Sequence, residues 1–83
     1  MPDPRSFALV VVETADIGRL HNIHSAAAAQ MLLFEWPEEG RGPAYRSALR
    51  TCLAALEGKA TTAIARATFI AAAEEVGIFV EAG

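Results

Sequence analysis

Residues 34–45, FEWPEEGRGPAY, lie between two helical patterns and fix where one helix ends and the next begins. A residue that precedes proline avoids helical dihedrals, so a helix running toward Pro37 has to stop just before it. Pro43 suits the first position of the next helix, where a missing N–H costs nothing. Gly40 and Gly42 let the chain turn between the two prolines. The stretch therefore predicts two helices joined by a tight interhelical turn.

The helix before this turn is expected over residues 26–36, AAAAQMLLFEW. Ser25 is a good N-cap for it, because its hydroxyl can accept a backbone N–H of the first turn. Side chains at the i, i+3, i+4 and i+7 positions share one side of a helix and predict a contact with the core. Here they are Ala29, Leu32, Leu33 and Trp36.

The helix after the turn has the clearest amphipathic pattern of the chain and is expected to end at Gly58. Its apolar arc comprises Tyr45, Ala48, Leu49, Cys52, Leu53 and Leu56. The polar side chains that face away from the arc are Arg46, Ser47, Arg50 and Glu57.

The last helix, expected from a cap at Thr61 to Val76, is apolar on two sides. Its main face comprises Ala65, Phe69, Ala72, Ala73 and Val76. A second, smoother strip comprises Ile64, Ala67 and Ala71. A helix with two apolar sides is usually sandwiched, so either another layer or a partner subunit should cover this strip.

Residues 7–12, FALVVV, form an unbroken apolar run, which is typical of a strand buried on both faces. The residues that follow supply turn chemistry. Residues 19–24 then predict a second strand, with His21 and Ile23 on its core side. Residues 78–81, IFVE, predict a last strand that joins this hairpin.

The resulting order, β-β-α-α-α-β, predicts an α+β fold. In it a small antiparallel sheet, made of the hairpin and the C-terminal strand, packs against three helices. A chain of 83 residues has no room for a second core. We therefore expect one domain over residues 7–81, preceded by a flexible N-terminus at residues 1–6.

The composition favours self-association. The chain is 53% hydrophobic, which exceeds the share in an average soluble domain. A small monomer can bury only part of that apolar surface, although much of the excess is alanine, which buries little area. We expect a homodimer, with an oligomer surface that comprises Ile64, Ala67, Ala71, Leu9 and Val11.

The sequence favours a cytoplasmic protein that does not enter a membrane. No apolar run approaches the roughly 20 residues that a membrane-spanning helix needs. The start, MPDPRSF, lacks the basic region and long apolar block of a signal peptide. The single cysteine cannot form an internal disulfide and fits a reducing compartment.

The net charge of −3 disfavours binding to nucleic acid. The candidates for contact with an anion or a partner are Arg41, Arg46, Arg50 and Arg66. Arg41 either pairs with Glu38 and Glu39 or faces a ligand. Arg66, at the edge of the core, either contacts a carboxylate of residues 35–39 or main-chain carbonyls, or faces a ligand. Arg46 and Arg50 lie on the polar face of their helix, which is either a solvated surface or part of a basic stripe.

The sequence contains no constellation of catalytic or metal-binding residues. A phosphate-binding P-loop needs a preceding strand and a Lys-Ser/Thr pair, and the GRG turn has neither. His21 and His24 are three apart on a strand and so point to opposite faces. Cys52 lies in the apolar arc without a neighbouring base, and Glu74 and Glu75 diverge by about 100° on their helix. We expect no metal, no cofactor and no enzymatic activity.

Several residues in and beside the helices stand at a characteristic spacing along the chain. They are Trp36-Pro37, Gly42-Pro43-x-Tyr45, Ala48 and Cys52, followed by Ala65-Arg66-x-x-Phe69-x-x-Ala72-Ala73-x-Glu75-x-Gly77-Ile78. This pattern resembles domain of unknown function 982, a family of small bacterial proteins, over about residues 7–80. The resemblance implies a stand-alone cytoplasmic protein and brings no known activity, cofactor or catalytic residue. One departure is residues 19–24, where two histidines replace the expected Thr, Val and Arg.

Two functions remain open. The leading hypothesis is a non-enzymatic protein-interaction or regulatory module that acts as a homo-oligomer. The alternative is a module that binds anions, nucleotides or nucleic acid weakly through Arg41, Arg46, Arg50 and Arg66.

Overall fold

The computed structural model describes residues 6–14 and 19–82. Its elements, in chain order, are β1 (Ser6–Glu13), β2 (Leu20–Ser25), α1 (Ala26–Phe34), a short 3-10 turn η1 (Glu38–Gly40), α2 (Pro43–Leu56), α3 (Thr62–Glu75) and β3 (Phe79–Ala82). This order confirms the predicted β-β-α-α-α-β arrangement and the α+β class. Most of the expected N-terminal segment and of the turn between the first two strands lies outside the described residues.

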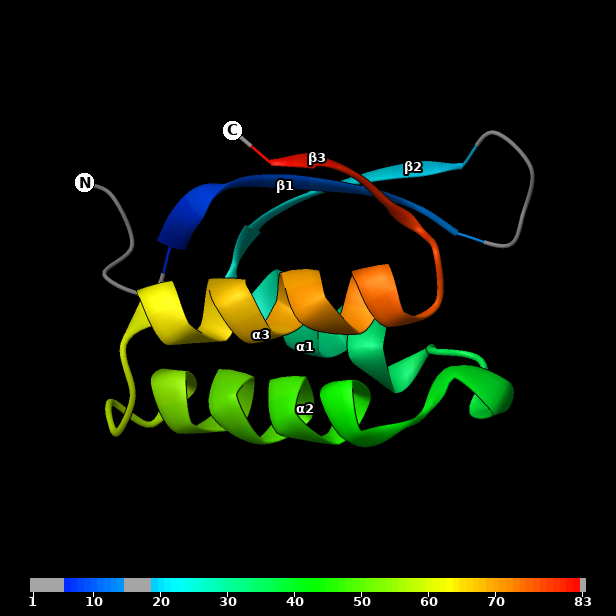
Figure 1. The fold of residues 1–83 in the computed structure, drawn as a ribbon. Coiled ribbons are helices and arrows are strands. Elements are labelled where there is room, and N and C mark those ends of the chain that lie inside the picture. The colour runs from blue at the N-terminus through cyan, green and yellow to red at the C-terminus, as the bar shows by residue number, and fades with distance from the viewer. Residues whose placement is uncertain (1–5, 15–18, 83) are drawn as a thin grey trace.

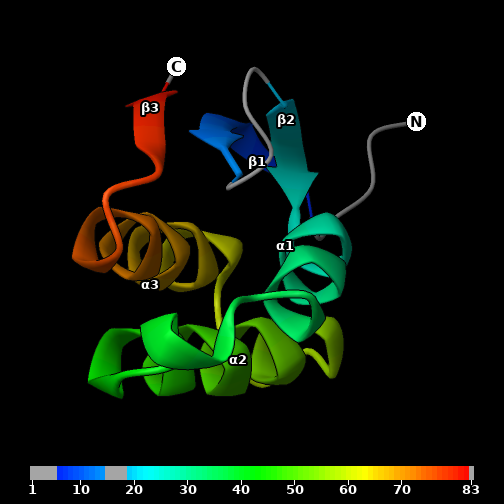
Figure 2. The same ribbon diagram turned by 90° about the vertical axis from the view of Figure 1, so that its right-hand side faces the viewer.

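The molecule has three layers (Figures 1 and 2). The sheet has the strand order β2-β1-β3, and both pairs are antiparallel. α1 and α3 lie side by side beneath one face of the sheet, and α2 packs against both of them on the side away from the strands. The helices therefore lie on one face of the sheet, as the element order predicts.

β1 is the central strand, which explains its unbroken apolar run. It pairs with β2 through Val10↔Ile23 and with β3 through Val12↔Phe79. Val10 and Val12 belong to the buried core between sheet and helices. Val11, which alternates to the opposite face of the sheet, is also buried, with 6% of its surface exposed.

Hydroxyl side chains cap the two helices for which the sequence predicts such a cap. Ser25 Oγ accepts the backbone N–H of Ala28 at 3.1 Å, and Thr61 Oγ1 accepts that of Ile64 at 3.1 Å. At the other end of α3, Gly77 takes a φ of +74°, which favours glycine. Local chemistry therefore sets these helix ends.

We expect Thr61→Ala to destabilise the domain by about 1 kcal/mol, because an N–H of the first turn of α3 loses its acceptor. Urea unfolding followed by circular dichroism measures the effect as a lower midpoint with an unchanged slope. Thr61→Ser keeps the hydroxyl and should restore the midpoint. Equal midpoints for Thr61→Ala and the wild type would show that this cap contributes nothing.

α1 is shorter than the sequence predicts, because it ends at Phe34 instead of Trp36. Glu35 and Trp36 donate their N–H groups to the carbonyls three residues earlier, Leu32 and Leu33, which tightens the last turn. The constraint from the following proline takes Trp36 out of the helix. The indole is consequently directed into the core, where 2% of the residue remains exposed.

The buried face of α2 is rotated relative to the predicted arc. Leu53, expected in the core, is 48% exposed, whereas Ala55, which the prediction omitted, is buried. The reason is that α2 packs chiefly on α3, and the Thr51 hydroxyl contacts that of Thr68 across this interface. Ala55 lies on the same side of the helix as Thr51, and Leu53 lies on the other.

Three aromatic rings form the centre of the core. The Trp36 ring lies 6.1 Å from that of Phe69 in an edge-to-face arrangement and 6.4 Å from that of Tyr45 in a stacked one. These spacings fall in the favourable range for aromatic pairs. Trp36 thereby joins the interhelical turn to both α2 and α3.

Candidate functional site

Arg41 stabilises the end of α1. Its Nε donates to the carbonyl oxygen of Trp36 at 3.1 Å, and its Nη2 donates to that of Phe34 at 3.3 Å. The guanidinium also lies over the Tyr45 ring, 5.5 Å from its centroid. A cation suits a helix C-terminus, whose carbonyls lack partners. The described contacts of Arg41 are thus with main-chain carbonyls and an aromatic ring, which differs from the expected pairing with the acidic segment.

The N-terminus of α2 already holds an anion from the protein itself. Glu75, at the end of α3, accepts the N–H of Ala44 through Oε2 at 3.1 Å. The two residues are 31 positions apart in the sequence. A Cβ on Gly42 would collide with the same carboxylate, so the glycine makes room for it. Glu75 occupies the place where an external phosphate would bind.

Arg66 joins α3 to the sheet. Its Nε donates to the carbonyl oxygen of Ala8 in β1 at 3.0 Å. A main-chain carbonyl is one of the two kinds of structural partner expected for Arg66, and this one belongs to β1. Arg46 and Arg50 are exposed on α2. The four arginines thus fall into two pairs: Arg41 and Arg66 donate to main-chain carbonyls, whereas Arg46 and Arg50 are exposed on α2.

The residues predicted to form an oligomer surface fall into two groups. Ile64 on α3 is 49% exposed, and Ala67 and Ala71 beside it are exposed as well. We call these three residues the α3 outer face. Leu9 is half-buried and Val11 is buried, so the β1 part of the predicted surface has little area available in one chain.

Cys52 is fully buried, and desolvation by burial raises the pKa of its thiol from 9.0 to about 11. We expect alkylation by iodoacetamide at pH 8 to be at least about 100-fold slower in the folded protein than in urea, because only the thiolate reacts. Equal rates in the folded and unfolded chains would contradict this environment.

The same shift predicts how stability depends on pH. The folded-state pKa lies above the unfolded one, so the contribution of Cys52 is fully present below pH 9 and is lost as the pH rises toward about 11. Unfolding free energies of the wild type and Cys52→Ala, each measured at pH 8 and above pH 10, test this. The wild type should lose more stability than the variant over that interval, and equal losses would contradict the prediction.

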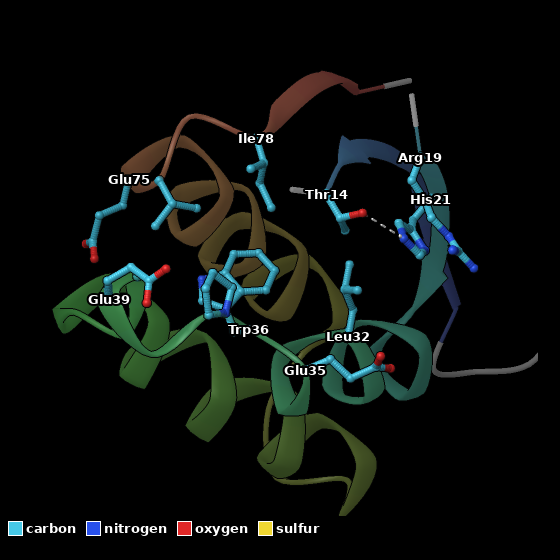
Figure 3. A pocket seen from close by; sticks show the side chains of 12 residues that line it. Thr14, Arg19, His21, Leu32, Glu35, Trp36, Glu39, Glu75 and Ile78 are labelled. Atoms are coloured by element: carbon cyan, nitrogen blue, oxygen red, sulfur yellow. Dashed lines mark hydrogen bonds between the residues drawn. The ribbon is translucent and has the colours of Figure 1, made fainter. Parts of the chain in front are cut away.

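A pocket of about 710 Å³ opens where the interhelical turn meets the sheet (Figure 3). Its walls come from the end of β1, the start of β2, the end of α1, η1 and the segment after α3. The apolar residues that line it are Leu32, Trp36, Pro37, Val76 and Ile78. The volume falls within the range of small-molecule sites. Sequence reasoning missed this pocket, because its walls are distant along the chain.

The polar side chains of the pocket stand around Trp36. Glu39 and Glu75 lie on one side of the indole, and Thr14, Arg19 and His21 lie on the other (Figure 3). The Thr14 hydroxyl is 3.5 Å from His21 Nε2. A third carboxylate, that of Glu35, completes the lining. Carboxylates therefore outnumber the guanidinium by three to one.

The indole N–H of Trp36 is buried and has no hydrogen-bond partner among the described residues. Most buried polar atoms in folded proteins are paired, and leaving one unpaired costs about 1–3 kcal/mol. The Nε1 atom lies beside Gly40, another lining residue, since a Cβ built there would be 3.6 Å away. The unpaired donor therefore lies in the interior next to Gly40, out of reach of solvent.

No group of three or more His, Cys, Asp or Glu side chains in residues 6–14 and 19–82 could hold a metal ion. None of the described helices is both long enough and apolar enough to cross a membrane.

Comparison with known proteins places the chain in a family. Searches of curated proteins and of solved structures returned no significant match. The sequence profile of a protein family of unknown function, DUF982, matches residues 9–80, which is most of the chain. Membership of this family assigns no catalytic activity. The chain belongs to the DUF982 family, as the spacing of its helical residues predicts.

Proposed function

We propose that this domain is a non-enzymatic protein-interaction module that acts as a homodimer. The observation that carries the proposal is the α3 outer face, which is apolar and which no described element covers. Ile64 is 49% exposed there. Ala67 and Ala71 are small, so a second helix could approach closely.

One of the two edges of the sheet, that of β3, lies on the same side of the molecule. β3 is an edge strand, and α3 lies beneath it (Figure 2). Val80 on this strand is 47% exposed. An edge strand presents unpaired backbone N–H and C=O groups that can pair with another strand. Two β3 strands pairing across a two-fold axis would bring two α3 outer faces together.

The area that a stable dimer interface needs to bury supports the use of both α3 and β3. A stable interface buries roughly 800 Å² on each partner, against a total accessible surface of 5014 Å² for one chain. A helix of 14 residues is only about 21 Å long. The α3 outer face is too small by itself, and the adjoining β3 edge extends it. This edge replaces Leu9 and Val11 in the interface, because β1 already pairs on both sides.

The surface suits a partner that is a second copy of the same chain. Most homodimers use one patch that contacts itself. Here the patch combines a self-complementary element, an edge strand, with a helix face of small residues. We therefore assign the surface to a second copy of this chain.

Substitution of Ile64 tests the interface without harming the fold. Thr61 already accepts the N–H of residue 64, so Ile64→Glu would complete a capping box at the start of α3. In the dimer, the same change would bury two charges and remove two apolar contacts. We expect Ile64→Glu to weaken dimerisation by at least about 30-fold, equivalent to about 2 kcal/mol, as measured by analytical ultracentrifugation.

Leu53 on α2 supplies the matched control. Its exposed fraction of 48% nearly equals that of Ile64. Leu53→Lys places a cation near the end of its helix, where the helix dipole favours it. This variant should dimerise like the wild type. If the two variants weaken the dimer equally, or if neither does, the α3 outer face is not the interface.

Anion binding through the arginines remains the second candidate, because Arg46 and Arg50 are exposed one turn apart on α2. Phosphate titration followed by the amide resonances of residues 42–46 distinguishes the two functions. The homodimer proposal expects these amides to stay unchanged, because Glu75 already accepts the N–H of Ala44. A saturable shift at millimolar phosphate would favour the arginine surface instead.

A further inference from the structure

We infer that the outer edge of β2 binds an extended segment of a partner protein as an added strand, with one large apolar side chain of that segment in the pocket beneath the edge. This edge and that of β3 lie at opposite sides of the sheet, because the strand order is β2-β1-β3. The inference therefore does not depend on the proposed homodimer. Two observations carry it: the direction of the backbone groups of β2 and the position of the pocket beside this strand.

The backbone of β2 directs every second residue away from β1. The N–H of Thr14 donates to the carbonyl oxygen of Arg19 at 3.0 Å, which makes these two residues a hydrogen-bonded pair. Such pairs alternate with non-hydrogen-bonded pairs along an antiparallel ladder, so Leu20 and Asn22 belong to the second kind. The N–H and C=O groups of Leu20 and Asn22 therefore point to the outer edge, and those of His24 follow by the same alternation.

No charged side chain or proline protects this edge. Natural proteins commonly use charges, prolines or very short strands to keep an exposed edge from pairing with another chain. β2 comprises six residues, LHNIHS, whereas β3 comprises four. The residues whose backbone groups point outward, Leu20, Asn22 and His24, are all exposed. Unpaired main-chain N–H and C=O groups of this kind recognise an extended peptide.

The pocket extends beneath β2. His21 on β2 and Leu32 on α1 both line it, and α1 lies beneath this strand (Figures 2 and 3). His21 pairs with Val12, whose side chain belongs to the core between sheet and helices, so His21 lies on that same face of the sheet. A residue of an added strand that lies opposite His21 would share this face and point toward the pocket.

The pocket sets the chemistry of the side chain that enters it. Its volume is about 710 Å³, and its apolar lining includes Leu32, Val76 and Ile78. An aromatic or aliphatic side chain placed there would be removed from water. When a peptide adds a strand to a sheet, main-chain hydrogen bonds give affinity and pockets for alternate side chains give specificity. The partner is thus an extended segment with a large apolar residue opposite His21.

The experiment uses short capped peptides and ¹⁵N-labelled protein. The first peptide, TVTFTVT, places valine and phenylalanine on one face of a strand and threonine on the other. The second peptide replaces the phenylalanine with alanine. The third carries N-methyl groups on the threonines beside the phenylalanine, which removes the main-chain donors that would face β2 and leaves the side chains unchanged.

The phenylalanine peptide should shift the backbone amide resonances of Leu20, Asn22 and His24 saturably at millimolar concentration, and it should slow the exchange of these amides with solvent. The amides of His21 and Ile23, which face β1, provide the internal control and should keep their exchange rates. The alanine peptide and the N-methylated peptide should each bind at least about tenfold more weakly.

Three results of these titrations would overturn the inference. The first is the absence of a saturable shift at the outward amides of β2, and the second is a set of shifts confined to residues 79–82. The third is equal affinity for the phenylalanine peptide and the N-methylated peptide, which would exclude strand addition. Equal affinity for the phenylalanine and alanine peptides would overturn the role assigned to the pocket.

Asn22→Pro tests the edge from the side of the protein. It removes one outward N–H and leaves the ladder with β1 intact, because an edge strand tolerates proline where the N–H faces solvent. Asn22→Thr keeps the N–H and is the matched control. The proline variant should bind the phenylalanine peptide at least about tenfold more weakly than the threonine variant, and equal affinities would contradict the inference.

Light scattering of the same two variants tests whether a second copy of this chain occupies the edge instead. Both variants should have the molar mass of the wild type, because the proposed homodimer uses the opposite edge of the sheet. A lower mass for Asn22→Pro than for Asn22→Thr would assign the β2 edge to self-association and overturn the inference.

Discussion

Phe69→Ala is expected to destabilise the domain by about 3–5 kcal/mol. Phe69 is the largest of the fully buried side chains. It lies on α3 between the sheet and the other two helices, and its ring contacts Trp36 edge to face at 6.1 Å. Truncation would leave a cavity at the point where the three layers meet. Because small domains are stable by only about 5–15 kcal/mol, the variant should be close to unfolded at 37 °C.

Phe34→Ala is the matched control, since it removes the same side chain from a site that is 61% exposed. It should change stability by no more than about 0.5 kcal/mol. Chemical denaturation of both variants, followed by circular dichroism, measures the difference. Similar losses in the two variants would contradict the position of Phe69 at the centre of the core.

Gly40→Ala is expected to destabilise the domain by about 1–3 kcal/mol, through overpacking. A Cβ at this position would lie 2.6 Å from Val76 Cγ1 and 3.6 Å from two atoms of the Trp36 indole. Valine is β-branched and restricted at χ1, so its methyl group has little freedom to move away. The new methyl group would therefore push η1 away from the end of α3, where both segments line the pocket.

Gly42→Ala provides the comparison within the same turn. Its Cβ would meet the carboxylate end of Glu75, a flexible side chain that can move aside. The expected cost is about 1 kcal/mol or less, corresponding to the hydrogen bond to the Ala44 N–H. Thermal unfolding followed by Trp36 fluorescence ranks the two variants. A larger loss in Gly42→Ala than in Gly40→Ala would contradict the packing of the turn.

Local chemistry made most of the fold predictable. Ser25 and Thr61 cap their helices, Pro43 begins α2, and Gly77 ends α3, each by a mechanism that involves only a few neighbouring residues. Because these signals fix where each element begins and ends, the element order and the α+β class follow from the sequence.

The long-range contacts of Glu75 and Arg66 could not be predicted from neighbouring residues in the sequence. Glu75 reaches the N-terminus of α2 from 31 positions away, and Arg66 reaches Ala8 from 58. The pocket likewise exists only after the strands and the interhelical turn have come together. Leu53 illustrates the same limit, because its exposure depends on which neighbour α2 packs against, and helical periodicity does not specify that neighbour.

The molar mass of the wild-type chain in solution tests the central claim, self-association through α3 and β3, most directly. Light scattering after size-exclusion chromatography, with the protein at high micromolar concentration, should give about twice the 8.8 kDa of one chain. The mass should fall toward the single-chain value on dilution. A mass of 8.8 kDa at every concentration would contradict the homodimer.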